Sequence, residues 1–396
     1  MGEKRILMIS SVPFWPLNEG NKVRTNNLIS HLKTCGYIVD FLYYDMYGLS
    51  GEDKMKSMIG EEHMIHLVKQ EVSPRDYYLE HIVHRVINRP KTAPEFYLLA
   101  DGFCTKELRE CVKTQLRTRK YDMVWLEYYF FSKVFEDIGK DYIKVIDTHD
   151  IFAGRDKLFP KKMRKKWSDS LSRLSERKVL RRADYVLAIQ ETEEKYFKKL
   201  LRGTKTKVLT IGNVEAHHRA KSVLVKNLDF CFVGSGNQIN IASITWFVEK
   251  VYPLIKEALP EARLLLVGKI CQEMDDLEEI VKLGQVENLE EIYHKVRVII
   301  NPTLMGTGLN IKASEAVFYQ KPMVTTSCGA RGFCNQEPIF EVADAPEEFA
   351  GKVIDLLVND RKCELLMENC RRYNEKYERE NMERLRSIGN DITENI

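Results

Sequence analysis

Short apolar runs, rich in β-branched residues, alternate along the chain with stretches of helical periodicity. Such runs are typical of strands that are buried on both faces, as in a parallel sheet. The runs predict strands at 5–10, 38–43, 123–127, 142–146, 183–189, 230–233, 263–267, 281–285, 296–300 and 323–326. The helical pattern predicts helices at 23–35, 241–258, 346–358, 362–373 and 379–388. Strands that alternate with helices in two successive blocks indicate two α/β domains.

The stretch 48–119 is polar and lacks a clear strand pattern, so we expect it to be mostly helical. It carries four histidines at helical spacing, His63, His66, His81 and His84. No carboxylate completes the HExxH pattern of a zinc site, so we expect exposed helix histidines there.

The unit from Val296 to Thr326 carries most of the candidate chemistry. A strand leads into a loop with Gly306 and Gly308, followed by a helix and a second strand. In open α/β sheets such a unit places a ligand at the carboxyl ends of the strands. The glycines allow a ligand to approach the backbone, and the start of the helix attracts anions such as a diphosphate.

Lys312 and Glu315 are three residues apart on the predicted helix, so they share one face. A cation beside a phosphate and a carboxylate near two vicinal hydroxyls would together hold a nucleoside diphosphate. The same spacing also fits an ordinary strand–turn–helix with a solvated Lys–Glu pair. Spacing alone leaves both interpretations open.

Composition and length narrow the class of protein. The 396 residues exceed what one hydrophobic core usually supports, which favours two domains. No apolar run reaches the roughly 20 residues that span a bilayer, and the first residues do not resemble a signal peptide. The nine cysteines form no CxxC pairs, which indicates reduced thiols and no zinc site. We therefore expect a cytoplasmic enzyme, and the net charge of +3 excludes no partner.

The segment GTGLNIKASEAVFYQKPMVTTSCGARGF resembles the donor-site signature of glycosyltransferase family 4, in the subgroup with the pattern Gly-Thr-Gly-x-x-x-Lys-x-x-Glu-Ala. The resemblance implies the GT-B fold, in which two Rossmann-like α/β domains face each other across a cleft and a C-terminal helix crosses back. We accordingly expect an acceptor-binding domain at 1–212, a nucleotide-sugar-binding domain at 213–373 and the returning helix at 374–396.

The resemblance also implies a set of site residues. Contacts with the donor are expected from Gly20, Val286, Gly306, Thr307, Gly308, Leu309, Asn310, Lys312 and Glu315. Lys312 would stabilise the leaving diphosphate. His149, in an Asp-Thr-His-Asp segment after a strand, would donate a hydrogen bond to a hydroxyl of the transferred sugar, although a purely structural histidine also fits. Arg24 and Glu127 are expected in the acceptor region.

Two positions and one segment depart from the family pattern. Thr307 stands where many members have a glutamate, and Gln320 stands where many have a glycine. The segment Ser235–Ile241 lacks the Arg and Lys that many members use to bind the diphosphate. The cationic role therefore moves to Lys312.

The resemblance implies transfer of a sugar, with retention, from a nucleoside diphosphate sugar to a glycan or glycolipid acceptor. It implies no metal ion and no cofactor besides the donor. Two alternatives remain at this point. One is a nucleotide-sugar 2-epimerase of the same fold, and the other is a non-catalytic nucleotide-sugar-binding module, which Thr307 favours.

The stretch Arg155–Arg182 is strongly basic, with twelve Lys or Arg against three Asp or Glu. Phe159, Met163 and Trp167 form an apolar stripe within it. A basic amphipathic helix of this kind can lie on an anionic membrane surface, here the inner face, or can be an ordinary solvated helix. No motif supports nucleic-acid binding.

Overall fold

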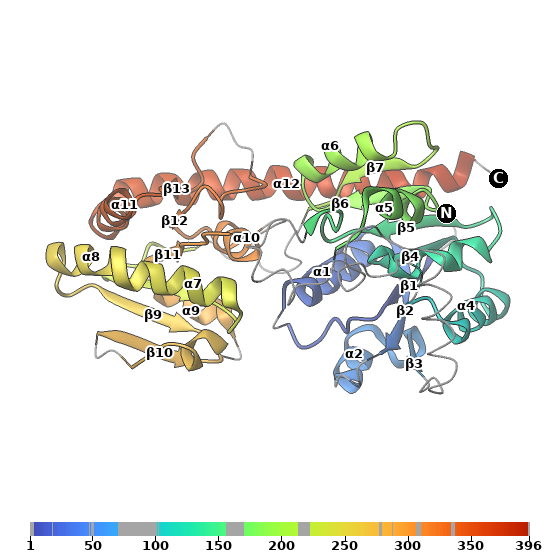
Figure 1. The fold of residues 1–396 in the computed structure, drawn as a ribbon, viewed down its shortest axis with the longest axis horizontal. Helices are drawn as coiled ribbons and strands as arrows, with labels where there is room; N and C mark the ends of the chain where they lie inside the picture. The colour runs from blue at the N-terminus through green and yellow to red at the C-terminus, as the bar shows by residue number, and fades with distance from the viewer. Residues whose placement is uncertain are drawn as a thin grey trace. The chain divides into compact units, whose positions relative to one another are not determined.

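The computed structural model describes residues 4–17, 19–46, 48, 51–69, 101, 103–155, 170–212, 222–276, 279–286, 288–305, 310–333 and 337–394. The chain divides into two compact units (Figure 1). Unit 1 comprises Met1–Ala216 and Asn381–Ile396, and unit 2 comprises His217–Glu380. The segment that returns to unit 1 thus begins at Asn381. We expected a returning helix at 374–396.

Unit 1 is built on a seven-stranded parallel sheet in the order β3-β2-β1-β4-β5-β6-β7. Its strands are β1 (Lys4–Ser10), β2 (Tyr37–Asp45), β3 (Met64–Val68), β4 (Met123–Glu127), β5 (Ile143–Asp147), β6 (Tyr185–Ala188) and β7 (Lys207–Thr210). The strand order reverses between β1 and β4. In doubly wound α/β folds, ligands bind beyond the carboxyl ends of the strands at such a switch point.

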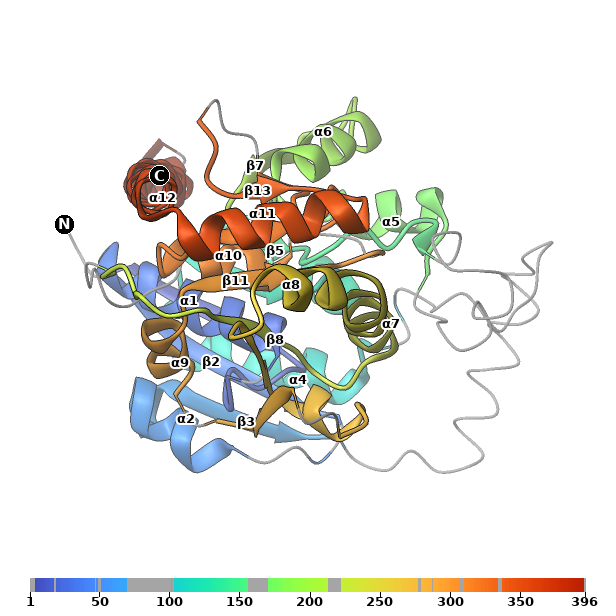
Figure 2. The same ribbon diagram turned by 90° about the vertical axis from the view of Figure 1, so that its left-hand side faces the viewer.

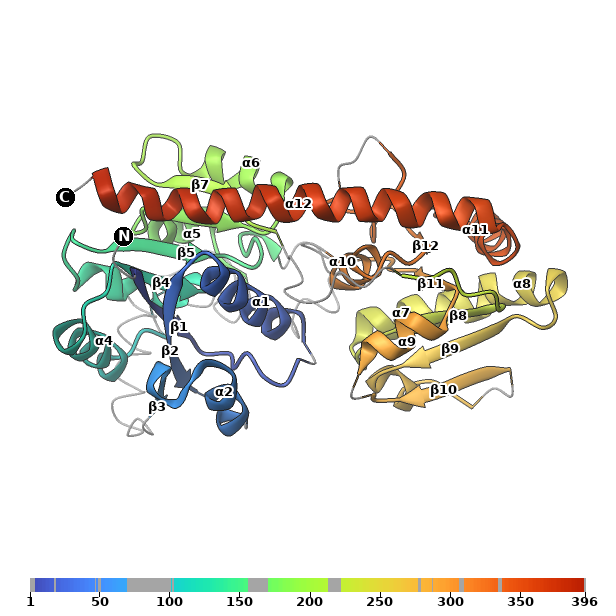
Figure 3. The same ribbon diagram turned by 180° about the vertical axis from the view of Figure 1, so that it is seen from behind.

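Helices cover both faces of this sheet. One face packs on α1 (Gly20–Thr34), α2 (Glu52–Ile59) and the last part of α12 (Asp360–Glu394), which lie in front of the sheet in Figure 3. The other face packs on α4 (Lys106–Thr118), η3 (Tyr129–Glu136), α5 (Arg173–Leu180) and α6 (Glu191–Leu200). The strands are therefore buried on both sides, which explains their nearly continuous apolar character.

Unit 2 repeats this architecture with a parallel sheet in the order β10-β9-β8-β11-β12-β13. Its strands are β8 (Asp229–Val233), β9 (Arg263–Val267), β10 (Ile280–Gly284), β11 (Val298–Asn301), β12 (Met323–Thr325) and β13 (Glu341–Val342). One face packs on α7 (Gln238–Trp246), η6 (Phe247–Val251), α8 (Tyr252–Ala258) and α11 (Pro346–Val358). The other face packs on α9 (Leu289–Lys295) and α10 (Ile311–Phe318), and Figure 2 shows α9 opposite α7 and α8. A short 3₁₀ turn, η7 (Lys269–Gln272), follows β9.

The long helix α12 contributes to both units. Its residues up to Glu380 belong to unit 2 and the rest belong to unit 1. In unit 1, the amide of Gly212 donates to Asn381 Oδ1 at 2.8 Å, and Lys4 Nζ donates to the carbonyl of Gly389 at 2.6 Å. A Cβ at Gly389 would lie 1.8 Å from the hydroxyl of Tyr37, so only glycine fits this contact.

Two parallel-sheet α/β domains, as the alternating pattern predicted, are confirmed. The expected bounds of β4, β9 and α11 agree with the structure to the residue. Two helices predicted at 362–373 and 379–388 are instead one continuous helix, α12, because 374–378 contains no glycine or proline and includes the good helix formers Glu375, Lys376 and Glu378. The predicted helix at 241–258 is interrupted by the π-helical segment η6 just before Pro253, which has no N–H to donate to the preceding turn.

The prediction of a mostly helical stretch at 48–119 is wrong at β3, which pairs in parallel with β2. From Ile65 to Val68 half-buried and exposed residues alternate, which is the period of a strand. His63 Nδ1 donates to Asp40 Oδ1 at 2.7 Å, and His66 stacks on Tyr43. These two histidines therefore lie on a turn and a strand, while His81 and His84 lie outside the described residues.

Of the helices that the structure describes, none combines the length and the apolar character needed to cross a membrane.

Candidate functional site

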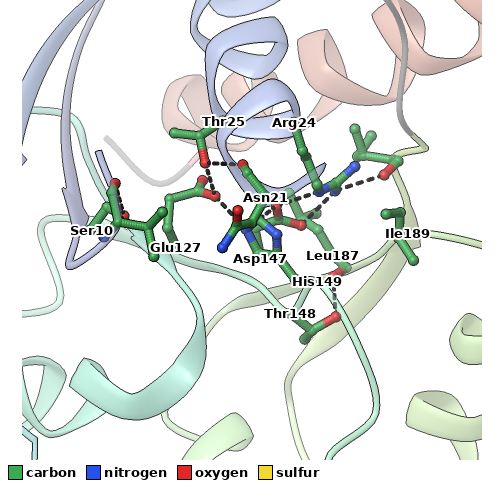
Figure 4. A network of polar contacts seen from close by, with 12 residues as sticks. Ser10, Asn21, Arg24, Thr25, Glu127, Asp147, Thr148, His149, Leu187 and Ile189 are labelled. Carbon is green, nitrogen blue, oxygen red and sulfur yellow. Dashed lines mark hydrogen bonds and ion pairs between the residues drawn. The ribbon is translucent and has the colours of Figure 1, made fainter. Parts of the chain in front are cut away.

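Two buried carboxylates lie side by side where β4 and β5 end. Glu127 and Asp147 are partners in the register of these adjacent parallel strands, and neither side chain is exposed. Arg24, on α1, donates from Nε and Nη2 to the two oxygens of Asp147 at 2.7 and 2.6 Å (Figure 4). Buried like charges are tolerated only when a cation compensates them, and this bidentate ion pair supplies one.

The Glu127 carboxylate is held by three other side chains. Trp125 Nε1 donates to Oε1 at 2.8 Å, and Thr25 Oγ1 donates to Oε2 at 3.0 Å. His149 Nε2 lies 2.6 Å from the same Oε2. Both oxygens of Glu127 are thus engaged, so its position is fixed.

His149 follows β5 and reaches back over the two carboxylates (Figure 4). Its backbone has a φ of 58°, a left-handed conformation that is uncommon for residues other than glycine. Nε2 must carry a hydrogen to bond Glu127, and it also lies 3.3 Å from Asp147 Oδ2. Among the described residues every hydrogen bond and ion pair of His149 involves Nε2. Nδ1 is therefore the ring nitrogen left to meet a ligand, and the expected hydrogen bond from His149 to a sugar hydroxyl stays a prediction.

Arg24 and Glu127, expected in the acceptor region, are both buried in this network. Their polar atoms bond to Asp147, His149 and neighbouring groups. In the structure they therefore hold other side chains of the site in place. A direct contact of either residue with an acceptor stays a prediction. Gly20 is the first residue of α1, one turn before Arg24.

In unit 2, α10 begins directly after the predicted glycine loop. Gly306, Thr307, Gly308 and Leu309 lie outside the described residues. Asn310 is the N-cap of α10, because its Oδ1 accepts from the amide of Ala313 at 3.3 Å. Its Nδ2 donates to Thr303 Oγ1 at 3.1 Å. The positive end of the helix dipole thus lies where the sequence predicted an anion.

Lys312, in the first turn of α10, is half-buried. Its ammonium donates to Asn240 Oδ1 at 2.7 Å and lies 5.5 Å from the centre of the Phe232 ring. Burial lowers the pKa of Lys312 to about 8, and the charge of Glu315 opposes this shift. Asn240 in turn donates from Nδ2 to the carbonyl of Ser235 at 2.9 Å. The ammonium is therefore held beside the segment Ser235–Ile241, which lacks cations of its own.

Glu315 Oε2 accepts a hydrogen bond from the hydroxyl of Tyr293 at 3.1 Å. Burial and the nearby Glu315 charge raise the pKa of Tyr293 well above its ordinary value, so the phenol stays a donor. Val286, just after β10, packs against the apolar cluster that includes Tyr293. Lys312, Glu315 and Val286 thus all belong to the part of unit 2 around α9 and α10.

Sequence reasoning missed three residues of these networks. Asp147 was seen only as part of the motif around His149, and Asn240 only as part of a segment without cations. Tyr128 was not among the expected site residues, yet its ring stacks on His149 with centroids 4.2 Å apart. For Asp147, the last residue of β5, and for Tyr128, directly after β4, the position at the carboxyl end of a strand was the available signal.

Glu127, Asp147 and His149 each offer an atom that could bind a metal ion, within 4.8 Å of one another. Arg24 engages both oxygens of Asp147, and the Nε2 hydrogen of His149 faces Glu127. The geometry fits an ion-pair network better than a set of metal ligands. Metal independence itself stays a prediction.

Much of the basic stretch Arg155–Arg182 lies outside the described residues, including 156–169. In its described part, Lys178 and Arg182 form ion pairs with Asp101, and Arg182 also pairs with Glu136. These cations are neutralised within unit 1.

Residues 227–359 match the family model described as "Glycosyl transferases group 1". Unit 2 therefore carries a group 1 glycosyltransferase domain. An uncharacterized 44.6 kDa protein in the cps region of Klebsiella pneumoniae is 27% identical over 105 residues, which are 24% of this chain and 27% of that protein. The chain thus spans about a quarter of the length of this curated relative.

Solved structures are similar over nearly the whole chain. The pneumococcal O-GlcNAc transferase GtfA, in complex with UDP and GlcNAc, has a TM-score of 0.68 at 11% identity and matches 99% of this chain and 100% of its own. TarM of S. aureus has a TM-score of 0.67 at 14% identity, with 97% and 98% covered. Sucrose-phosphate synthase from Thermosynechococcus elongatus has a TM-score of 0.66 at 14% identity, with 99% of each chain covered. At these identities the similarity shows the fold, and the fold is GT-B.

Proposed function

We propose that this chain is a retaining glycosyltransferase of the family 4 type, which moves a sugar from a nucleoside diphosphate sugar to a glycan or glycolipid acceptor without a metal ion. The observation that carries the proposal is the environment of the Lys312 ammonium. The ammonium is half-buried at the start of α10 and bonds a neutral amide, within the segment that matches the group 1 glycosyltransferases. A cation in this setting suits an anionic ligand.

On the donor side, the diphosphate binds the start of α10 and the Lys312 ammonium, with the loop Gly306–Asn310 approaching it. Glu315 accepts hydrogen bonds from the ribose hydroxyls, and Val286 contacts the base through its backbone. As the bond between the sugar and the diphosphate breaks, negative charge grows on the leaving oxygen. The helix amides and Lys312 stabilise that charge, which is an electrostatic form of catalysis.

On the sugar side, His149 contacts a hydroxyl of the transferred sugar through Nδ1. Glu127 holds the Nε2 hydrogen, and the Arg24–Asp147 pair holds the carboxylate beneath the ring. With His149 occupied by a sugar hydroxyl, the leaving phosphate accepts the proton of the acceptor hydroxyl. This last step follows from the resemblance to family 4.

The test is incubation of the protein with UDP-, GDP- and dTDP-sugars, starting with UDP-sugars because four of the similar structures contain UDP. Slow donor hydrolysis supports a transferase, inversion at C2 supports an epimerase, and binding without turnover supports a binding module. The matched variant is His149→Ala, for which nucleoside diphosphate affinity stays near wild type and turnover falls by about 10²-fold. Equal loss of both quantities would mean that the site has collapsed.

Peripheral contact with an anionic membrane surface through Arg155–Arg182 is a separate part of the proposal. Each cation near such a surface adds about 1 kcal/mol of binding, screened over roughly 10 Å at about 0.1 M salt. We expect co-sedimentation with anionic vesicles that is lost in high salt and on replacing Lys161, Lys162, Lys165 and Lys166 by Gln. Wild-type protein that stays in the supernatant at low salt would remove the membrane contact and leave the transferase proposal intact.

A further inference from the structure

We propose that Tyr128 is a positioning residue for His149: its ring sets the plane of the imidazole, while Glu127 sets the direction of Nε2. This inference rests on the proposed function, in which His149 contacts the transferred sugar. Tyr128, which directly follows the neighbouring strand β4, would thus be a second residue, besides Glu127, that orients His149.

The backbone of Tyr128 is the first observation. Its φ of 64° and ψ of 155° lie in a region that is essentially restricted to glycine. Tyr128 directly follows β4, as His149, with its own positive φ, follows β5. The amide of Tyr128 donates to the carbonyl of Asp147 at 2.9 Å, which holds the unusual conformation in place. Such strain persists only where surrounding structure enforces it, and it concentrates at functional sites.

The stack between the two rings is the second observation. The Tyr128 and His149 rings have centroids 4.2 Å apart and planes within 15° of parallel. Without the positive φ, a side chain directly after β4 would take another direction from the backbone. The strained conformation is therefore what places the phenol over the imidazole.

The far end of the Tyr128 side chain lies near the start of α1. Burial raises the pKa of Tyr128, and the nearby side chain of Asn21, in the first turn of α1, opposes this shift. The phenol therefore stays neutral and keeps its hydrogen.

Neither support is sufficient by itself. A hydrogen bond from Nε2 to Glu127 fixes one atom of the imidazole, but the ring can still rotate about that bond. A flat ring stacked on the imidazole stops this rotation. Together they fix Nδ1, the atom that would meet the sugar hydroxyl.

The experiment compares Tyr128→Gly, Tyr128→Phe and His149→Ala in the full chain. Glycine removes the ring but suits the φ and ψ of this position, and phenylalanine keeps the ring without the hydroxyl. We expect Tyr128→Gly to lower kcat for donor turnover about tenfold or more, since small displacements of a positioned group are costly, with nucleoside diphosphate affinity within about twofold of wild type. Tyr128→Phe should retain most of the activity.

A second readout reports the stack directly. An aromatic ring stacked on an imidazole shifts the imidazole proton resonances upfield, and His149→Ala identifies them among nine histidines. The shift should persist in Tyr128→Phe and vanish in Tyr128→Gly. Should the glycine variant fail to fold, Tyr128→Leu, which keeps apolar bulk without a flat ring, should lose the shift and the turnover in its place.

The outcomes separate this inference from the function on which it rests. Wild-type turnover and unchanged His149 resonances in Tyr128→Gly, with an inactive His149→Ala, would overturn the role of Tyr128 alone. Full activity of His149→Ala would overturn the proposed role of His149, whatever the Tyr128 variants do.

Discussion

The two candidate sites treat charge in opposite ways. At the ends of β4 and β5, Arg24 pairs with Asp147, and His149 bonds Glu127. At the start of α10, Lys312 bonds the neutral amide of Asn240 and, among the described residues, forms no ion pair. At the first site the charges pair with one another, whereas at the second the Lys312 ammonium bonds a neutral amide and has no ion-pair partner among the residues that the structure describes.

This difference corresponds to two different tasks. Paired buried charges lock side chains in place, but they leave little potential for attracting a ligand. A lone ammonium keeps its potential for an anion, at the cost of a pKa that burial has lowered to about 8. We infer that unit 1 orients a polar group and that unit 2 binds charge.

Breaking the ion pair in unit 1 should have the largest effect. Arg24→Ala leaves the fully buried Asp147 carboxylate without its cation, so the free energy of unfolding should fall by about 3–5 kcal/mol. Urea unfolding measures this. The double variant with Asp147→Asn should recover part of the loss, and a loss below about 1 kcal/mol would show that the network does not depend on the pair.

Removing the carboxylate in unit 2 should act on binding instead. Glu315→Gln should weaken nucleoside diphosphate binding by about 1–3 kcal/mol, the range for a charge-assisted hydrogen bond. Tyr293→Phe is the matched control, because it deletes the hydroxyl that bonds Glu315 and leaves the carboxylate. Calorimetry that finds unchanged affinity in folded Glu315→Gln would remove Glu315 from the site.

The lowered pKa of Lys312 makes binding depend on pH. The free protein loses the Lys312 charge as the pH rises through about 8, whereas a bound diphosphate favours the charged form. Affinity should therefore fall above pH 8, by at most about 1.4 kcal/mol per pH unit. Lys312→Arg should remove this dependence, and a flat profile in the wild type would contradict the role of Lys312.

The smallest expected effect concerns the amide that holds Lys312. Asn240→Ala should weaken nucleoside diphosphate binding by about 0.5–1.5 kcal/mol, as for one neutral hydrogen bond. Asn240→Asp places a carboxylate beside the ammonium, so the fall in affinity should move to higher pH. If Asn240→Asp leaves the pH profile unchanged, the Lys312 ammonium does not titrate in this range.

The fold was largely predictable because its strands are buried on both faces. Runs such as 123–127 and 263–267 are apolar throughout, and they became β4 and β9 with the expected bounds. The edge strand β3 was missed because only Met64 in it is buried and because His66 lies at helical spacing from His63, just before the strand. The local sequence pattern cannot distinguish such an edge strand from a helix unless the strand that pairs with it is known.

Local spacing and family resemblance were sufficient to single out Lys312 and Glu315, whose roles stay a prediction. The pairing of Arg24 with Asp147 joins residues 123 positions apart, so it follows from how α1 packs on the sheet. The backbone angles of Tyr128 likewise have no signature in residue type, since tyrosine is rare in that conformation.

The divided course of α12 has a consequence for synthesis. Ribosomes release a chain from its first residue to its last, so all of His217–Glu380 emerges before the segment that unit 1 still lacks. Met382, Leu385 and Ile388 pack in one cluster with Ile6 and Met8 from the first strand. Part of the apolar surface of the first strand therefore stays uncovered while the whole of unit 2 is translated. Chaperones that shield such surfaces would act on this protein during that interval.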